Sequence, residues 1–164
     1  MKKYVFFFLF FVCVLSCVFS QYTFKISTGT FTANEIIRGG TGSLAAWTDS
    51  NARAGAIGYV NDINSVDKKN LGPIPPGTYE IIGVRQTLHG NQHQNVIVLN
   101  RIRGDALGRD NDFMIHGSRS DEATSGNNGS NGCILMSPTN RQKIADAFRE
   151  CNRLGVTLTL VVIK

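Results

Sequence analysis

Phe-Met-Ile-His-Gly at residues 113–117 and Gly-Ser-Asn-Gly-Cys-Ile at residues 129–134 are the two stretches that decide the fold. Each contains or borders a short apolar run typical of a buried strand, and each carries one reactive side chain, His116 or Cys133. The residues between them are rich in Gly, Ser and Asn, which predicts a loop. We therefore expect one strand to deliver the histidine and a second strand to begin at the cysteine.

This pair of side chains has the composition of an activated thiol. A free cysteine has a pKa of about 8.5, so an adjacent imidazole that takes its proton raises its nucleophilicity. Gly132 allows a tight turn, so that backbone N–H groups can face a substrate carbonyl and form an oxyanion hole. Ser130 can hydrogen-bond locally and hold the loop. The pattern therefore predicts Cys133 as nucleophile and His116 as general base.

Two structural interpretations compete with this chemistry. Cys133 could form a disulfide with Cys151, because the first twenty residues resemble an export signal and disulfides form outside the cell. His116 could be a buried histidine with no catalytic role, the usual fate of a histidine on an apolar strand. Titration of free thiols separates the cases: two thiols favour the enzyme, and none favours a structural disulfide.

The surrounding sequence predicts a mainly β chain with one C-terminal helix. Ser137 and Pro138 form a helix start, and Gly155 forms its end. Apolar residues recur at helical spacing between them. We expect strands at residues 22–27, 56–60, 79–84, 96–99, 113–115 and 156–163, a hairpin joining 30–32 to 36–37, a loop region over 38–72, and a turn at Asn91.

The 164 residues predict one domain at 21–164 behind a signal peptide at 1–20. Lys2 and Lys3 precede an apolar run to Val18, and cleavage after Ser20 lowers the net charge from +5 to +3. Cys17 lies in a poor lipoprotein motif, so lipidation stays open. The basic residues are scattered, which argues against nucleic-acid binding, and no later stretch is long enough to span a membrane.

Other titratable residues have simpler interpretations. We interpret His89 and His93 as lying at a solvated hairpin tip, because no third metal ligand is near them; no metal or cofactor is expected. Arg109 and Asp112 are interpreted as a surface pair. Arg119, in the loop between the two motifs, either meets substrate charges or is solvated.

The motifs together resemble the L,D-transpeptidase (YkuD-type) catalytic domain, whose signature is a histidine, a spacer of about this length, and Ser/Thr-x-Gly-Cys. Here thirteen residues separate His116 from Ser130. Thr28-Gly-Thr-Phe31 and Gly72-Pro-Ile-Pro-Pro-Gly-Thr-Tyr79 add a resemblance to a compact subgroup that includes cell-wall toxins. The resemblance implies a compact β-sandwich or barrel of mixed strands with the C-terminal helix packed on it.

The resemblance also implies roles for residues. Cys133 attacks the carbonyl of the third stem residue of peptidoglycan and expels the terminal D-alanine, while His116 is held by a carbonyl near Gly117. The N–H groups of Gly132 and Cys133 form the oxyanion hole. The remaining expected site residues are Ser130 in support, and Arg141, Arg119 and Asn131 as substrate contacts. Leu135 stands where many relatives carry arginine.

The implied function is L,D-carboxypeptidase, D-amino-acid exchange or L,D-transpeptidase activity outside the cell, either extracellular or periplasmic. The expected partners are peptidoglycan stem peptides and a cognate immunity protein, and we expect a monomer with no membrane attachment after signal cleavage. The alternative is a secreted wall-binding module or inactive homologue with a Cys133–Cys151 disulfide.

Overall fold

The computed structural model describes residues 21–34, 36–38, 42–118 and 129–164. The expected signal peptide at 1–20 and the expected substrate contact Arg119 lie outside these residues. Within them, no helix is long and apolar enough to cross a membrane.

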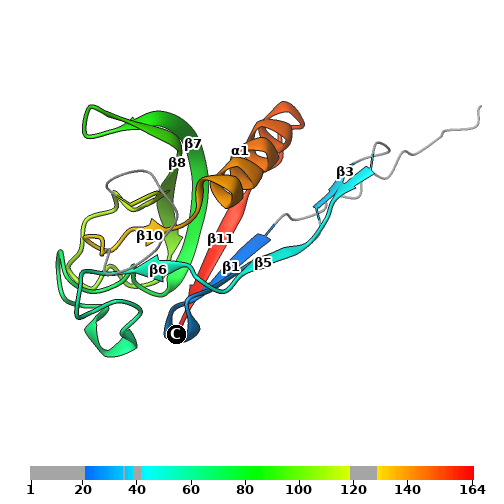
Figure 1. Ribbon diagram of the computed structural model, residues 1–164. Helices are drawn as coiled ribbons and strands as arrows, with labels where there is room; N and C mark the ends of the chain where they lie inside the picture. The colour runs from blue at the N-terminus through cyan, green and yellow to red at the C-terminus, as the bar shows by residue number, and fades with distance from the viewer. Residues whose placement is uncertain (1–20, 35, 39–41, 119–128) are drawn as a thin grey trace, which may run out of the picture.

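The described chain is dominated by one nine-stranded mixed sheet in the order β5-β2-β1-β11-β7-β8-β9-β10-β6 (Figure 1). Strands β1 and β11 are parallel, as are β9 and β10, whereas the remaining neighbours are antiparallel. The strands are β1 (Gln21–Lys25), β2 (Thr30–Ala33), β5 (Trp47–Asp49), β6 (Arg53–Ala54), β7 (Gly77–Leu88), β8 (Asn91–Arg103), β9 (Met114–His116), β10 (Ile134–Leu135) and β11 (Thr159–Ile163). The 3-10 turns are η1 (Ile26–Thr28) and η2 (Ile63–Ser65). The expectation of a mainly β fold is confirmed.

The single described helix, α1 (Pro138–Arg153), begins as the sequence predicts. The Ser137 hydroxyl accepts a hydrogen bond from the Asn140 N–H, and Pro138 occupies the first turn, where its missing N–H costs nothing. The helix lies beside the long strands β7 and β8 (Figure 1). Its inward face consists of Arg141, Ile144, Ala145, Ala147 and Cys151, so all but one of its buried residues are small or apolar.

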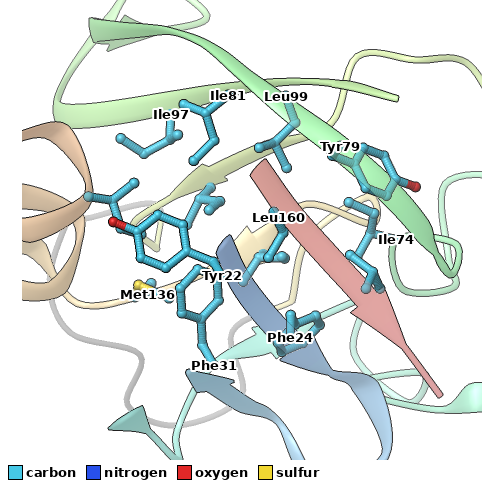
Figure 2. Packing of buried hydrophobic residues seen from close by; sticks show 14 of the residues in the cluster. Tyr22, Phe24, Phe31, Ile74, Tyr79, Ile81, Ile97, Leu99, Met136 and Leu160 are labelled. Carbon is cyan, nitrogen blue, oxygen red and sulfur yellow. The ribbon is translucent and has the colours of Figure 1, made fainter. Parts of the chain in front are cut away.

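The core lies between this helix and the curved sheet. Alternate residues of β1 and β11 are buried, as expected for strands with one face turned inward. Figure 2 shows Tyr22, Phe31, Ile97 and Leu160 converging on this interior. The rings of Tyr22 and Phe31 lie 5.4 Å apart, a distance typical of paired aromatic side chains.

The long hairpin β7–β8 turns two residues earlier than expected. His89 and Gly90 make the turn with φ of 49° and 82°, and Asn91 begins β8. Glycine permits a left-handed backbone and histidine is among the residues that adopt it more often than most, so His89-Gly90 is the local turn signal and Asn91 already belongs to the strand. The hairpin also contains register shifts between β7 and β8, and such irregularities bend a ribbon.

The region at 30–60 differs most from the sequence prediction. The expected hairpin between 30–32 and 36–37 does not form, because β2 pairs with β1 and β5. Instead β3 (Ile36–Arg38) pairs with β4 (Gly42–Leu44) in a separate two-stranded sheet. The strand expected at 56–60 is also wrong, since β6 pairs with β10 a few residues earlier. These pairings depend on distant partners that local patterns do not reveal.

Candidate active site

The parallel pairing of β9 with β10 brings the two sequence motifs together. Ile134 pairs with Ile115 and Leu135 with His116, so Cys133, just before β10, lies beside the start of β9. Both His116 and Cys133 line one pocket of about 440 Å³. The pocket is lined by Leu88, His89, Asn91, His93, Met114, His116, Gly117, Ser118, Gly129, Ser130, Asn131 and Cys133.

The orientation of His116 is fixed by the backbone. Its Nδ1 lies 2.6 Å from the carbonyl oxygen of Gly117, the contact expected from the sequence. A carbonyl oxygen can only accept, so Nδ1 carries the hydrogen and Nε2 of the neutral ring remains available to take a proton. Burial lowers the pKa of His116 below its ordinary value of 6.5; the hydrogen bond to Gly117 opposes this shift, and the nearby His93 adds to it. The imidazole is therefore neutral, as a general base must be.

The thiol of Cys133 is neutral in the same state. Burial raises its pKa to about 11, although the backbone N–H of Met114 opposes this rise. The residue is nevertheless partly exposed at the pocket surface. The pocket therefore holds a neutral thiol and a neutral imidazole at rest. These pKa shifts do not favour a thiolate–imidazolium pair at rest. The nucleophile role predicted for Cys133 would therefore require proton transfer to His116 during attack.

Ser130 is the central hydrogen-bonding residue of the turn at residues 130–133, which we call the nucleophile turn after the role predicted for Cys133. Its hydroxyl donates to the carbonyl oxygen of Cys133 at 2.5 Å and accepts from the N–H groups of Gly132 at 3.2 Å and Gly55 at 3.3 Å. Its own N–H donates to the carbonyl oxygen of Gly55 at 2.8 Å. One small side chain thus fixes the turn internally and ties it to the segment after β6.

The same contacts bear on the expected oxyanion hole. The Gly132 N–H points at the Ser130 hydroxyl, so it has to exchange this bond before it can donate to a substrate oxygen. The N–H of Cys133 lies close enough to its own sulfur to lower the thiol pKa. The oxyanion role of these two groups stays a prediction.

The expected substrate contact at Arg141 has to be corrected. Its side chain is completely buried. Its guanidinium donates to the carbonyl oxygen of Met136 at 3.1 Å and to that of Gln94. Arg141 therefore anchors α1 to the strands below it and has no surface to offer a substrate. Asn131, by contrast, is exposed and lines the pocket, where a substrate could reach it.

Two residues near the site were misjudged from the sequence. His93 was interpreted as solvated, but it is buried on β8 with its ring edge-to-face against His116, 6.4 Å between centroids. Arg109 was interpreted as a surface residue, but it is buried behind the nucleophile turn and donates to the Asn131 carbonyl. Neither position lies on a periodic apolar pattern, so no local signal reveals their burial.

Neither of the two described cysteines forms a disulfide bond. Cys151 is buried on α1 within the hydrophobic core, whereas Cys133 lines the pocket. The disulfide required by the structural alternative is therefore not formed in this structure.

The pKa of His116 predicts where activity falls with acid. Because the folded pKa is below 6.5, the imidazole stays neutral at neutral pH and is protonated only on further acidification. We expect kcat/KM to be flat around pH 7 and to fall about tenfold per unit below an inflection under pH 6.5. Stability should also decline there, because the unfolded chain takes up the proton first. An acid inflection at or above pH 7 would contradict this environment.

Ser130→Ala should weaken both the turn and the activity. It removes one donor and one shared acceptor, so we expect a loss of about 2 kcal/mol in the free energy of unfolding. Displacement of the sulfur should lower turnover roughly 10- to 100-fold. Ser137→Ala is the matched control, since it removes a helix cap worth about 1 kcal/mol at a residue outside the pocket lining and should leave turnover unchanged. Denaturant unfolding and steady-state kinetics measure both.

Fold and site together define a mainly β protein with a cysteine and an oriented histidine in one polar pocket. The family described as Tlde1 domain matches residues 49–160, a span that contains every described residue of this pocket. The chain therefore belongs to the Tlde1 domain family, a toxin family related to L,D-transpeptidases. This confirms the resemblance seen in the sequence motifs.

Several solved structures are similar to the chain, and no curated protein matches it. An L,D-transpeptidase from Mycobacterium smegmatis is 16% identical with a TM-score of 0.47, covering 88% of this chain and 58% of that one. L,D-transpeptidase 1 from Mycobacterium tuberculosis is 18% identical with a TM-score of 0.47, covering 89% and 62%. An L,D-transpeptidase from Stackebrandtia nassauensis is 15% identical with a TM-score of 0.48, covering 91% and 59%. The match thus spans about three fifths of each of these longer chains.

Proposed function

We propose that the protein is a peptidoglycan-modifying cysteine enzyme that forms an acyl-enzyme on stem tetrapeptides. The observation that carries this proposal is the shared pocket of Cys133 and His116 in a chain of the Tlde1 domain family. The hydrogen bond from His116 to the Gly117 carbonyl leaves the other ring nitrogen available as a base. No other described cysteine lines this pocket.

The proposed reaction has two steps. The Cys133 sulfur attacks the carbonyl carbon of the third stem residue while Nε2 of His116 takes the thiol proton. The C–N bond to the terminal D-alanine then breaks, and the imidazolium returns the proton to the departing amine. The resulting thioester is resolved by water, by a free D-amino acid or by an amine of another stem. These acceptors correspond to carboxypeptidase, exchange and transpeptidase activity.

The charge of the pocket is compatible with such a substrate. Its described lining contains three histidines and no carboxylate. A terminal D-alanine carries a free carboxylate, which an acidic lining would repel. The wall lies outside the cytoplasm, so the proposal also places the protein there, with an immunity protein as a partner if the producer makes the same wall. The alternative, a wall-binding module closed by a Cys133–Cys151 disulfide, lacks its bond here.

The test is product analysis by mass spectrometry. Purified disaccharide-tetrapeptides are incubated with the wild-type protein, alone and with an added D-amino acid. We expect loss of the terminal D-alanine, or its replacement by the added residue, and a transient acylated protein mass. Unchanged tetrapeptides, or cleavage at another bond of the stem, would contradict the proposal.

A further inference from the structure

Arg109 is a buried cation directly behind the nucleophile turn. It is 6% exposed and lies between Phe113 and the segment that precedes β7. Its Nη1 donates to the carbonyl oxygens of Val66 at 3.1 Å, Gly72 at 3.0 Å and Pro73 at 2.5 Å. A guanidinium loses its hydrogen bonds to water when it is buried. The three carbonyl oxygens compensate for this loss by accepting hydrogen bonds from Arg109.

The other end of the guanidinium reaches the turn itself. Nη2 donates to the carbonyl oxygen of Asn131 at 3.0 Å. It also lies against Gly132, where an added Cβ would come within 2.1 Å of it. Arg109 therefore holds the two residues that immediately precede the sulfur of Cys133.

We propose that Arg109 is a positioning residue for Cys133, which fixes the nucleophile turn and supplies a permanent positive charge that favours the ionised sulfur. This inference rests on the proposed function of Cys133 as nucleophile. A guanidinium suits the task because it keeps its charge when buried and offers several donors in a fixed plane. A lysine could supply the charge but not this set of bonds.

The charges near the sulfur predict in which direction each substitution changes the pKa of the Cys133 thiol. The positive charge of Arg109 lowers the pKa of the Cys133 thiol, whereas the carboxylate of Asp112 raises it. Burial outweighs both. His116 faces the same pocket and stays neutral. Removing Arg109 or Asp112 should therefore change the reactivity of the thiol in opposite directions.

The experiment measures alkylation of Cys133 by iodoacetamide at pH 8, without substrate, followed by intact mass. Cys133→Ser supplies the background from the other cysteines of the chain. Arg109→Gln should slow alkylation roughly three- to fivefold, because losing the nearby positive charge raises the pKa of the Cys133 thiol and higher nucleophilicity regains only part of the lost thiolate. Arg109→Lys should react at nearly the wild-type rate, and Asp112→Asn should react faster.

The direction of the change separates charge from structural support. Arg109→Gln and Arg109→Lys both lose the bonds to the turn, but only Arg109→Gln loses the charge, so an Arg109→Gln rate equal to or faster than that of Arg109→Lys overturns the inference. Should Arg109→Gln fail to fold, the exposed Asp112 remains testable, and an unchanged or slower rate in Asp112→Asn also overturns it.

Failure of this inference is distinguishable from failure of the proposed function. Alkylation needs no substrate, so it reports the state of the thiol even if stem peptides are not turned over. Suppose that the wild type releases D-alanine but the alkylation rate does not depend on the charges at Arg109 and Asp112. The proposed function would then be retained, and the proposed role of Arg109 would be wrong. In Arg109→Lys we further expect kcat to fall while alkylation is retained, because the bond to Asn131 is lost.

Discussion

Cys133→Ala should abolish release of D-alanine from stem tetrapeptides, lowering the rate by at least about 10⁴-fold. The loss is this large because the methyl side chain of alanine cannot become acylated, and the proposed acyl-enzyme forms on the sulfur. Stability should hardly change, since Cys133 is partly exposed at the pocket and lies outside the hydrophobic core. We expect the unfolding midpoint to stay within about 2 °C of wild type.

Cys151→Ala is the matched control and should behave in the opposite way. Cys151 is 3% exposed within the core, so losing its sulfur leaves a small cavity. We expect a loss of about 1 to 2 kcal/mol in unfolding free energy with full activity. Mass spectrometry of the products and thermal unfolding measure both variants. Equal product from wild type and Cys133→Ala would remove Cys133 as nucleophile.

The elements that the sequence predicts well are those with a strong local signal. The helix begins at Ser137 and Pro138 because capping chemistry is local, and its buried stripe follows from a period of 3.6 residues. The placement of His116 and Cys133 at two short strands was also predictable, because each borders a short apolar run, whereas the parallel pairing of the two strands is known only from the structure. The motif does not predict the protonation states of the His116 imidazole and the Cys133 thiol, because these depend on burial.

The errors occur where distant residues decide the structure. The strands around residue 50 are two or three residues long and owe their existence to partners such as β2 and β10. Arg141 and Arg109 are arginines in polar sequence, which normally indicates exposure. Both are buried because backbone carbonyls far away in the sequence happen to surround them. The composition of the chain and the spacing of its residues do not indicate which backbone carbonyls will surround an arginine, so the burial of these two side chains could not be predicted.

Gly132→Ala should abolish the proposed activity and destabilise the fold, because both backbone strain and a steric clash arise at this position. The backbone φ of Gly132 is 119°, a conformation that residues with a Cβ rarely adopt. The new Cβ would also lie 2.1 Å from Nη2 of Arg109, which is held by carbonyls and cannot easily withdraw. We expect a loss of about 3 kcal/mol or more in unfolding free energy. A shift of the sulfur by about 1 Å should lower turnover at least 100-fold.

Gly58→Ala separates the two costs. Gly58 also has a positive φ, 85°, but nothing lies within 4 Å of the position of its Cβ. It should therefore show only the backbone strain of about 1 kcal/mol and retain full turnover. Denaturant unfolding and kinetics on stem tetrapeptides measure both variants. If Gly132→Ala costs no more stability than Gly58→Ala and remains active, Arg109 cannot be packed against the turn, and the rigid support proposed for the sulfur would lose its physical basis.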